Sequence, residues 1–231
     1  MPLKFLAQVK SLPIFRERSP SDLENLLYGA EEKRVKHREV LFRAGEPANS
    51  FSVVVQGAFK LLRSNPAGDD IIVFFATPGD MIGGLLMSTP GSNYPVTSVA
   101  MGSGIVLEIP RETFLKSWSL DLTIQQRMSG MLFQRMSLLH DQKVLAKAPL
   151  TQKIACQILS LIERYCGEKE TILPIPLTRQ EIADSVGASV ESVIRVMSDW
   201  SHQGIIETSD QVIHVQQMGR LLEIIKGTEA T

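Results

Sequence analysis

The residues whose types and spacing could do chemistry are concentrated in one stretch, residues 176–206. Thr178 and Glu181 have the spacing of a capping box, Gly187 suits the end of a first short helix, and Ser189 suits the N-cap of a second. The pattern predicts a helix, a turn and a second helix. A second helix of this kind, with polar side chains in its first turns, enters the major groove of DNA and contacts base edges.

The second predicted helix has an apolar face and an outward face. The apolar face consists of Val193, Val196, Met197 and Trp200. The side chains that point partly or wholly outward are Val190, Glu191, Ser192, Ile194 and Arg195. Arg195 can donate to O6 and N7 of guanine, and Glu191 can accept from N4 of cytosine, so a base pair that both contact is chemically sensible.

The charges on this helix are also compatible with roles that do not involve DNA. Glu191 could be a solvated carboxylate stabilised by the helix dipole, or it could form an exposed ion pair with Arg195. Residues 151–231 also hold eleven acidic and seven basic residues, a net charge of −4, which is unusual for a domain that binds phosphate. Phosphate contacts would then depend on backbone amides and on Lys153, Arg179 and Gln180.

Composition and charge restrict the class of protein. The 231 residues include 24 Lys and Arg against 25 Asp and Glu, so no overall basic field attracts nucleic acid or an anionic membrane. Cys156 and Cys166 have helical spacing, which predicts inert thiols in or near the core rather than a disulfide or a zinc site. Residues 1–15 lack the long apolar region typical of a signal peptide, and no run of about 18 apolar residues is present to span a bilayer. We therefore expect a soluble, cytoplasmic protein without a membrane partner.

The first half of the chain has the pattern of short helices followed by strands. Loosely helical apolar spacing predicts two leading helices, the second capped by Ser19 or Ser21. From residue 31 to residue 109, runs rich in Val, Ile and Phe are separated by Gly45, Gly57, Gly68, Gly79 and Gly91. The first four of these glycines are 11 or 12 residues apart, which is typical of an antiparallel β-roll or barrel.

A segment without internal proline follows Pro110 and predicts a long helix that reaches about Leu145. An interrupted heptad along it is the candidate seam of a homodimer, formed by Ile124, Met128, Met131, Arg135, Leu138, Gln142 and Leu145. The alternative is an amphipathic helix that packs only on its own roll. Pro149 should end this helix, and an apolar face predicts another helix after it.

The end of the chain completes the predicted organisation. After Gly204, alternating runs around a Ser209–Asp210 turn predict a two-stranded wing. We therefore expect an α+β chain in three parts. These are a β-roll (jelly-roll) domain with leading helices at residues 1–110, a dimerisation helix at 111–147 and a winged helix-turn-helix domain at 148–231.

This order of elements resembles the superfamily of the cyclic-AMP receptor protein and the fumarate and nitrate reduction regulator (the CRP/FNR superfamily). The resemblance covers nearly the whole chain. Its matching segments are FRAGEPANSFSVVVQGAFKLLRSNPAGDDIIVFFATPGDMIGG, IVLEIPRETF and LTRQEIADSVGASVESVIRVMSDWSHQGII. It implies a cyclic-nucleotide-binding-like roll joined to a winged helix-turn-helix.

The resemblance implies a homodimeric transcription regulator that binds a palindromic site in double-stranded DNA, controlled by an effector in the roll. RNA polymerase is a further implied partner. Val190 and Glu191 with Arg195 are more similar to the oxygen-responsive branch than to the cyclic-AMP branch, although Ile194 departs from the Ser of that branch. The DNA-binding residues we expect are Thr178, Arg179, Gln180, Ser189, Val190, Glu191, Ser192, Ile194 and Arg195.

The resemblance also bears on the effector. Cyclic-nucleotide members hold the ribose with a Glu and the phosphate with an Arg-Ser pair, but Gly84 and Tyr94-Pro95 occupy these positions here. Without that cation and carboxylate, we do not expect cyclic AMP to bind in this manner. The corresponding residues are either plain core or a more apolar pocket, formed by Phe74, Ile82, Gly83, Gly84, Leu85, Leu86, Met87, Tyr94 and Pro95.

The available ligands limit cofactor chemistry. An iron–sulfur cluster of the oxygen-responsive kind needs about four thiolates, and no cysteine precedes residue 156. Haem stays open, with His37, His140, a methionine or Pro2 as axial ligands. A haem-dependent sensor of nitric oxide or carbon monoxide is therefore one alternative function, and a small hydrophobic effector is another.

Two alternatives come from other classes of protein. A cupin-like metalloenzyme would need at least two histidines in the roll, which contains only His37. The chain also lacks the common phosphate-loop, zinc-protease and serine-hydrolase motifs, so we expect no enzyme. The acidic C-terminal part leaves open an interaction protein whose helix-turn-helix no longer binds DNA.

Overall fold

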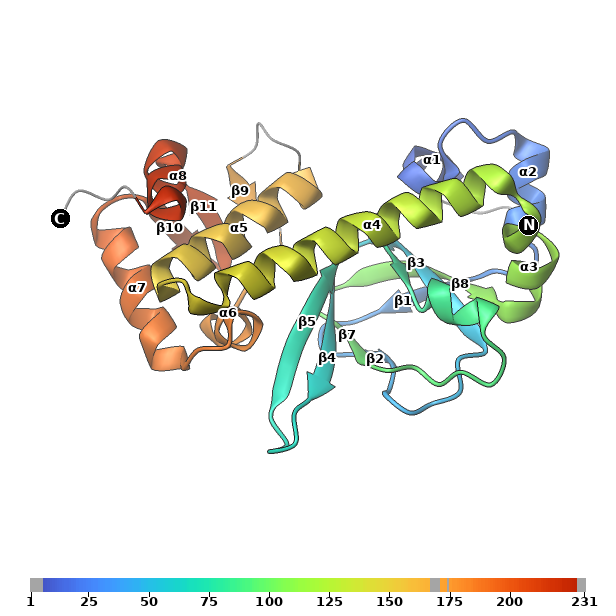
Figure 1. Cartoon of the computed structure of the whole chain (residues 1–231). Helices are drawn as coiled ribbons and strands as arrows, with labels where there is room; N and C mark the ends of the chain where they lie inside the picture. Colours follow the sequence, from blue (N-terminus) through green and yellow to red (C-terminus); the bar gives the residue numbers. More distant parts are fainter. Residues whose placement is uncertain (1–5, 167–170, 174, 228–231) are drawn as a thin grey trace. The chain divides into compact units, whose positions relative to one another are not determined.

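The structure is a computed structural model that describes residues 6–166, 171–173 and 175–227 (Figure 1). The chain divides into two compact units, one formed by residues 1–63 and 76–136 and the other by residues 64–75 and 137–231. Within the described ranges, no helix has the length and apolar character needed to cross a membrane.

The two predicted leading helices are present. Their bounds, with a short 3-10 turn between them, are α1 (Leu6–Ser11), η1 (Pro13–Phe15) and α2 (Pro20–Leu26). Ser19 is the cap of α2, because its side chain accepts from the backbone N–H of Asp22 at 3.1 Å while the Asp22 carboxylate accepts from the backbone N–H of Ser19. This reciprocal pair satisfies two amide donors that the helix start would leave free.

The predicted roll consists of two four-stranded sheets, with strand orders β1-β8-β3-β6 and β2-β7-β4-β5. The strands are β1 (Glu31–Val35), β2 (Val40–Phe42), β3 (Ser50–Gln56), β4 (Phe59–Ser64), β5 (Asp70–Ala76), β6 (Met81–Ile82), β7 (Thr97–Ala100) and β8 (Gly104–Pro110), with the short η2 (Gly84–Ser88) after β6. All five glycines that separate the predicted runs have positive φ. At Gly57, an added Cβ would lie 2.8 Å from the carbonyl oxygen of Ser103, so a side chain does not fit.

An aromatic cluster forms the core between the roll and the short helices of the first unit. The indole of Trp118 meets Phe51 edge-to-face at 4.8 Å between ring centroids and Phe15 at 5.6 Å. Its Nε1–H donates to the carbonyl oxygen of Leu26 at 2.7 Å, so the one polar atom of the buried ring is satisfied. The cluster joins segments more than 90 residues apart in the sequence.

The single helix predicted over residues 111–147 is wrong, because the segment is divided. It forms α3 (Arg111–Lys116), η3 (Trp118–Leu120), α4 (Leu122–Val144) and η4 (Leu145–Lys147). Asp121 explains where α4 begins. Its carboxylate forms an ion pair with Arg18 and accepts the backbone N–H of Ile124 at 3.0 Å, which caps the helix.

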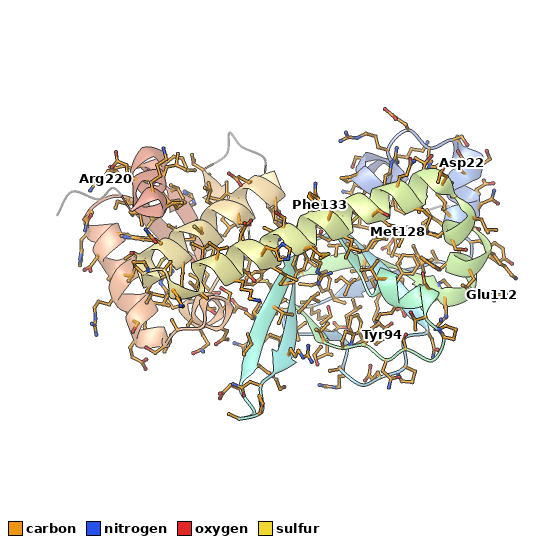
Figure 2. All side chains as sticks on the ribbon, in the orientation of Figure 1. Asp22, Tyr94, Glu112, Met128, Phe133 and Arg220 are labelled. Carbon is orange, nitrogen blue, oxygen red and sulfur yellow. The ribbon has the colours of Figure 1, made fainter. Side chains whose placement is uncertain are left out.

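The predicted dimer seam is wrong at its first two positions. Ile124 and Met128 are only 0% and 5% exposed, so these side chains pack inside their own chain and cannot contact a second one. Figure 2 shows Met128 and Phe133 on different sides of α4. Of the other predicted positions, Met131, Arg135, Leu138 and Leu145 are half-buried and Gln142 is exposed. The exposed apolar side chains of α4 beyond its first turn are Leu132, Phe133, Met136, Leu139 and Val144.

The second unit contains the predicted helix-turn-helix and wing. Its elements after α4 are α5 (Leu150–Cys166), β9 (Ile172–Leu173), α6 (Arg179–Val186), α7 (Val190–His202), β10 (Ile206–Ser209), β11 (Val212–Val215) and α8 (Met218–Lys226). The helix after Pro149 begins where predicted. Cys156 is half-buried, and burial raises the pKa of its thiol, which fits an inert cysteine. The side chain of Cys166 lies outside the described residues.

The wing is a three-stranded sheet in the order β10-β11-β9, so it has one strand more than predicted. Its turn also lies one residue later than predicted, because Ser209 pairs with Val212 and leaves Asp210 and Gln211 as the central residues. Their φ angles of 49° and 66° are those of a type I′ turn, whose twist matches a tight hairpin.

Candidate DNA-binding surface and effector site

The first helix of the motif, α6, is held by the predicted capping box. The backbone N–H of Thr178 donates to the Glu181 carboxylate at 2.9 Å, and the backbone N–H of Glu181 donates to Oγ1 of Thr178 at 3.1 Å. Gly187 ends the helix with φ of 67°, as its type predicts. The side chain of Thr178 is therefore engaged in fixing the start of α6.

The second helix, α7, has one buried face and one exposed face. Val193 and Met197 are 0% exposed and Trp200 is 3% exposed, whereas Val196 is only half-buried. Ser189 caps α7 through its hydroxyl, which accepts the backbone N–H of Ser192 at 3.3 Å. This burial directs the predicted base-contacting side chains outward, with Glu191, Ile194 and Arg195 exposed and Val190 and Ser192 partly exposed.

The charged groups of the exposed face find no partner among the described side chains. Within the described part of the chain, neither the Glu191 carboxylate nor the Arg195 guanidinium takes part in an ion pair or a side-chain hydrogen bond. The ion pair between them, which the sequence left open, is therefore absent. Both groups keep their full hydrogen-bonding capacity for a ligand.

Arg179 is positioned by the wing. Its guanidinium donates to Oγ1 of Thr208 at 3.0 Å, and burial lowers the pKa of this half-buried group. Gln180 is exposed and donates to the Asp184 carboxylate at 2.7 Å. The sequence does not reveal Thr208, because no local pattern connects two positions 29 residues apart. The contact ties the start of α6 to the wing.

The wing itself offers no cation. Residues 206–217 contain no Lys or Arg, and Glu207 accepts a hydrogen bond from Gln216 at 2.9 Å. Proteins that bind duplex DNA gain affinity by placing Lys and Arg against the phosphates. The wing strands therefore carry no cation that could neutralise a DNA phosphate.

In the roll, Tyr94 is the best-anchored of the predicted effector residues (Figure 2). Its ring stacks on Phe42 with centroids 3.8 Å apart and an angle of 13° between the planes. Its hydroxyl donates to the carbonyl oxygen of Ser50 at 2.6 Å. Gly83 allows the ring to approach, since a Cβ there would lie 3.0 Å from Cε1 of Tyr94. Phe42 was missed because its partner is 52 positions away in the sequence.

The charge next to Tyr94 is negative. The hydroxyl of Ser50 donates to the Glu108 carboxylate at 2.6 Å, and Lys33 lies 3.9 Å from the other carboxylate oxygen. Burial and the nearby Glu108 both raise the pKa of Tyr94, burial being the larger cause. A carboxylate and a neutral phenol do not stabilise a buried phosphate, which needs a cation or several donors.

The structure groups some of the predicted pocket residues and separates others. Ile82, Gly84 and Met87 are buried in the first unit, and Leu86 is half-buried. The prediction is wrong for Leu85 and Pro95, which are exposed and cannot line an interior pocket. Phe74 lies on β5 and is half-buried, and the Arg164 guanidinium lies 4.4 Å from the centroid of its ring, so its place in the pocket stays a prediction.

The predicted haem ligands are not in buried surroundings. His37 and His140 are both exposed, and Nδ1 of His37 lies 2.8 Å from the carbonyl oxygen of Met101. Pro2 lies outside the described residues. Within the ranges that the structure describes, no three His, Cys, Asp or Glu side chains are grouped so as to hold a metal ion.

Comparison with known proteins decides the family. Residues 32–119 match the cyclic nucleotide-binding domain, and residues 152–224 match the Crp-like helix-turn-helix domain. The transcriptional activator protein anr of Pseudomonas aeruginosa is 30% identical over 186 residues, which cover 78% of this chain and 75% of the relative. The chain belongs to the CRP/FNR family of transcription regulators.

Further relatives agree with this assignment. The transcriptional activatory protein AadR of Rhodopseudomonas palustris is 28% identical to this CRP/FNR regulator over 86% of the chain and 82% of the relative. The structure of FixK2 from Bradyrhizobium japonicum has the same fold, with a TM-score of 0.73 and 22% identity over 84% of this chain and 96% of that one. As predicted, the relatives are transcription regulators rather than enzymes.

The raised pKa of Tyr94 gives a testable pH dependence. The folded regulator keeps a phenol proton at alkaline pH that the unfolded chain loses near its usual pKa of about 10. The stabilisation is therefore complete below about pH 10 and declines as the pH rises through the raised pKa. Tyrosinate absorbance should show a late transition that Tyr94→Phe removes. Tyr28→Phe is the control, because it changes an exposed tyrosine and should leave the late transition in place. A late transition that is still present in Tyr94→Phe would contradict the assignment to Tyr94.

Proposed function

We propose that this CRP/FNR regulator acts as a homodimer that inserts α7 of each subunit into the major groove of a palindromic duplex site. The observation that carries the proposal is that Glu191 and Arg195 are exposed on a helix fixed by its opposite face and form no ion pair with any described residue. Two recognition helices related by twofold symmetry contact half-sites about 34 Å apart, one turn of DNA. RNA polymerase is a further expected partner.

Base contacts rather than phosphate contacts should dominate this interface. The second unit carries a net negative charge over residues 151–231, and its wing lacks Lys and Arg. The sequence-independent part of the affinity, which depends on neutralised phosphates, is then small. We expect binding that depends strongly on the sequence of the duplex and less steeply on salt than is usual for proteins that bind duplex DNA.

The surface for a second subunit is a stripe along α4 formed by Leu132, Met136 and Leu139. These side chains are 37%, 48% and 49% exposed. Their spacing of four and three residues is that of a coiled-coil seam, and exposed apolar groups at this spacing favour association of two like helices. This stripe is displaced by one residue around α4 from Met131, Arg135 and Leu138, whose place in a seam stays a prediction.

The effector proposed for the roll is a small molecule. It is not cyclic AMP held by the Glu and Arg-Ser groups of the cyclic-nucleotide members. By the family resemblance, Tyr94 and Gly84 correspond to the phosphate-binding and ribose-binding groups, and Glu108 adds negative charge beside Tyr94. A ligand without a phosphate fits these surroundings better. It would act by binding one dimer geometry more tightly than another, which shifts the population toward that geometry.

Substitution of Arg195 tests the proposed base contact. Arg195→Ala should weaken binding to a site selected from random duplexes by about 1–3 kcal/mol, because a bidentate contact to one base is lost. Discrimination at one base pair of each half-site should fall as well, as measured by competition binding. Arg220→Ala, an exposed arginine on α8, is the matched control and should bind as the unaltered chain does. Equal losses on every duplex would argue against base recognition.

Substitution of Met136 tests the seam. Met136→Asp should shift the chain from dimer to monomer in sedimentation velocity at micromolar concentration, since a carboxylate in an apolar seam lacks a partner. Gln134→Asp places the same charge on an exposed position of α4 outside the stripe and should remain dimeric. A Met136→Asp chain that sediments as a dimer would rule out this stripe as the interface.

A further inference from the structure

Ile194 is a large apolar side chain on the exposed face of α7. Its side chain is 47% exposed, whereas Val193 and Met197 of the same helix are fully buried. Between residues 178 and 215, all of them described, it is the only large apolar side chain that is exposed. Single exposed apolar residues are ordinary on protein surfaces, so the position of Ile194 rather than its exposure gives it meaning.

The neighbours of Ile194 are the groups that would contact bases. Glu191 precedes it by three residues and Arg195 follows it directly, and both are exposed and form no ion pair in the part of the chain that the structure describes. Residues three or four apart lie next to one another on a helix surface. The aliphatic side chain of Ile194 therefore lies beside the carboxylate of Glu191. In the proposed function, this group of side chains on α7 enters the major groove.

The chemistry of the major groove leaves one partner for this side chain. A branched aliphatic group neither donates nor accepts a hydrogen bond, so it gains nothing from the amino groups, carbonyl oxygens or ring nitrogens of base edges. Thymine alone among the four bases presents an apolar group there, its C5-methyl. We propose that Ile194 recognises the C5-methyl group of a thymine in each half-site. This inference rests on the proposed function, because it requires α7 to lie in the major groove.

The magnitude of the effect follows from the area of one methyl group. Removing a group of this size from water changes an equilibrium constant by about fourfold when burial is complete. Partial burial against an exposed isoleucine gives about two- to fourfold for each half-site, and two half-sites multiply to roughly four- to sixteenfold. Such ratios are well within the resolution of fluorescence anisotropy.

The experiment removes the methyl group and nothing else. The full chain first selects a binding site from a library of random duplexes. Each thymine of that site is then replaced by deoxyuridine in both half-sites, which deletes the C5-methyl and leaves every hydrogen-bonding group in place. We expect one symmetric pair of thymines at which this change weakens binding by roughly four- to sixteenfold.

A pair of variants assigns the effect to its residue. Ile194→Ala should bind the thymine and deoxyuridine duplexes equally, and its thermal unfolding should be close to that of the unaltered chain because the side chain is exposed. Leu222→Ala removes another exposed aliphatic group of the same unit, on α8, and should keep the full ratio between the two duplexes.

The failure of this inference can be told apart from the failure of the proposed function. A selected site with no methyl-dependent thymine would overturn the inference and leave base recognition intact. A ratio that persists in Ile194→Ala would overturn it as well and would transfer the methyl contact to another side chain, Val190 being the nearest apolar candidate. A chain that enriches no sequence at all would contradict the proposed function itself.

Discussion

The burial of one face of α7 is the constraint on which DNA recognition depends. Val193, Met197 and Trp200 recur every three or four residues and are almost completely buried, so the rotation of the helix about its axis is fixed. The caps also fix where α6 and α7 begin, since each cap satisfies backbone N–H groups that would otherwise need water. With the helix held in this way, Glu191 and Arg195 point outward, and neither has a partner within the described part of the chain. A helix that was free to rotate could not present a defined set of groups to base edges.

In the roll, the same fold as in cyclic-nucleotide-binding domains carries different chemistry. The hydroxyl of Tyr94 is bound to the backbone of Ser50, and its ring is stacked on Phe42. A neutral, buried phenol beside the Glu108 carboxylate cannot replace a cation against a phosphate. Membership of the family therefore identifies the architecture of this domain, whereas the side chains around Tyr94 lack the cation that a buried phosphate needs.

Local signals in the sequence were sufficient for most of the fold. The capping box of Thr178 and Glu181 and the break at Pro149 each involve residues within one helical turn, so their chemistry can be recognised without tertiary structure. Contacts between distant segments could not be predicted, and the stack of Phe42 on Tyr94 is one of them. The seam prediction was wrong at Ile124 and Met128 for a related reason. Two adjacent stripes of α4 have apolar periodicity, and only the tertiary structure shows that these two side chains are buried.

Methylation interference on a selected duplex tests the central claim most directly, because dimethyl sulfate modifies N7 of guanine in the major groove, one of the two acceptors offered to an arginine. Recognition by two α7 helices predicts interference at symmetric guanines in two half-sites whose centres lie about one helical turn apart, and none in the minor groove between them. Interference that is absent, or that is spread evenly over the duplex, would contradict recognition by two α7 helices of a symmetric dimer.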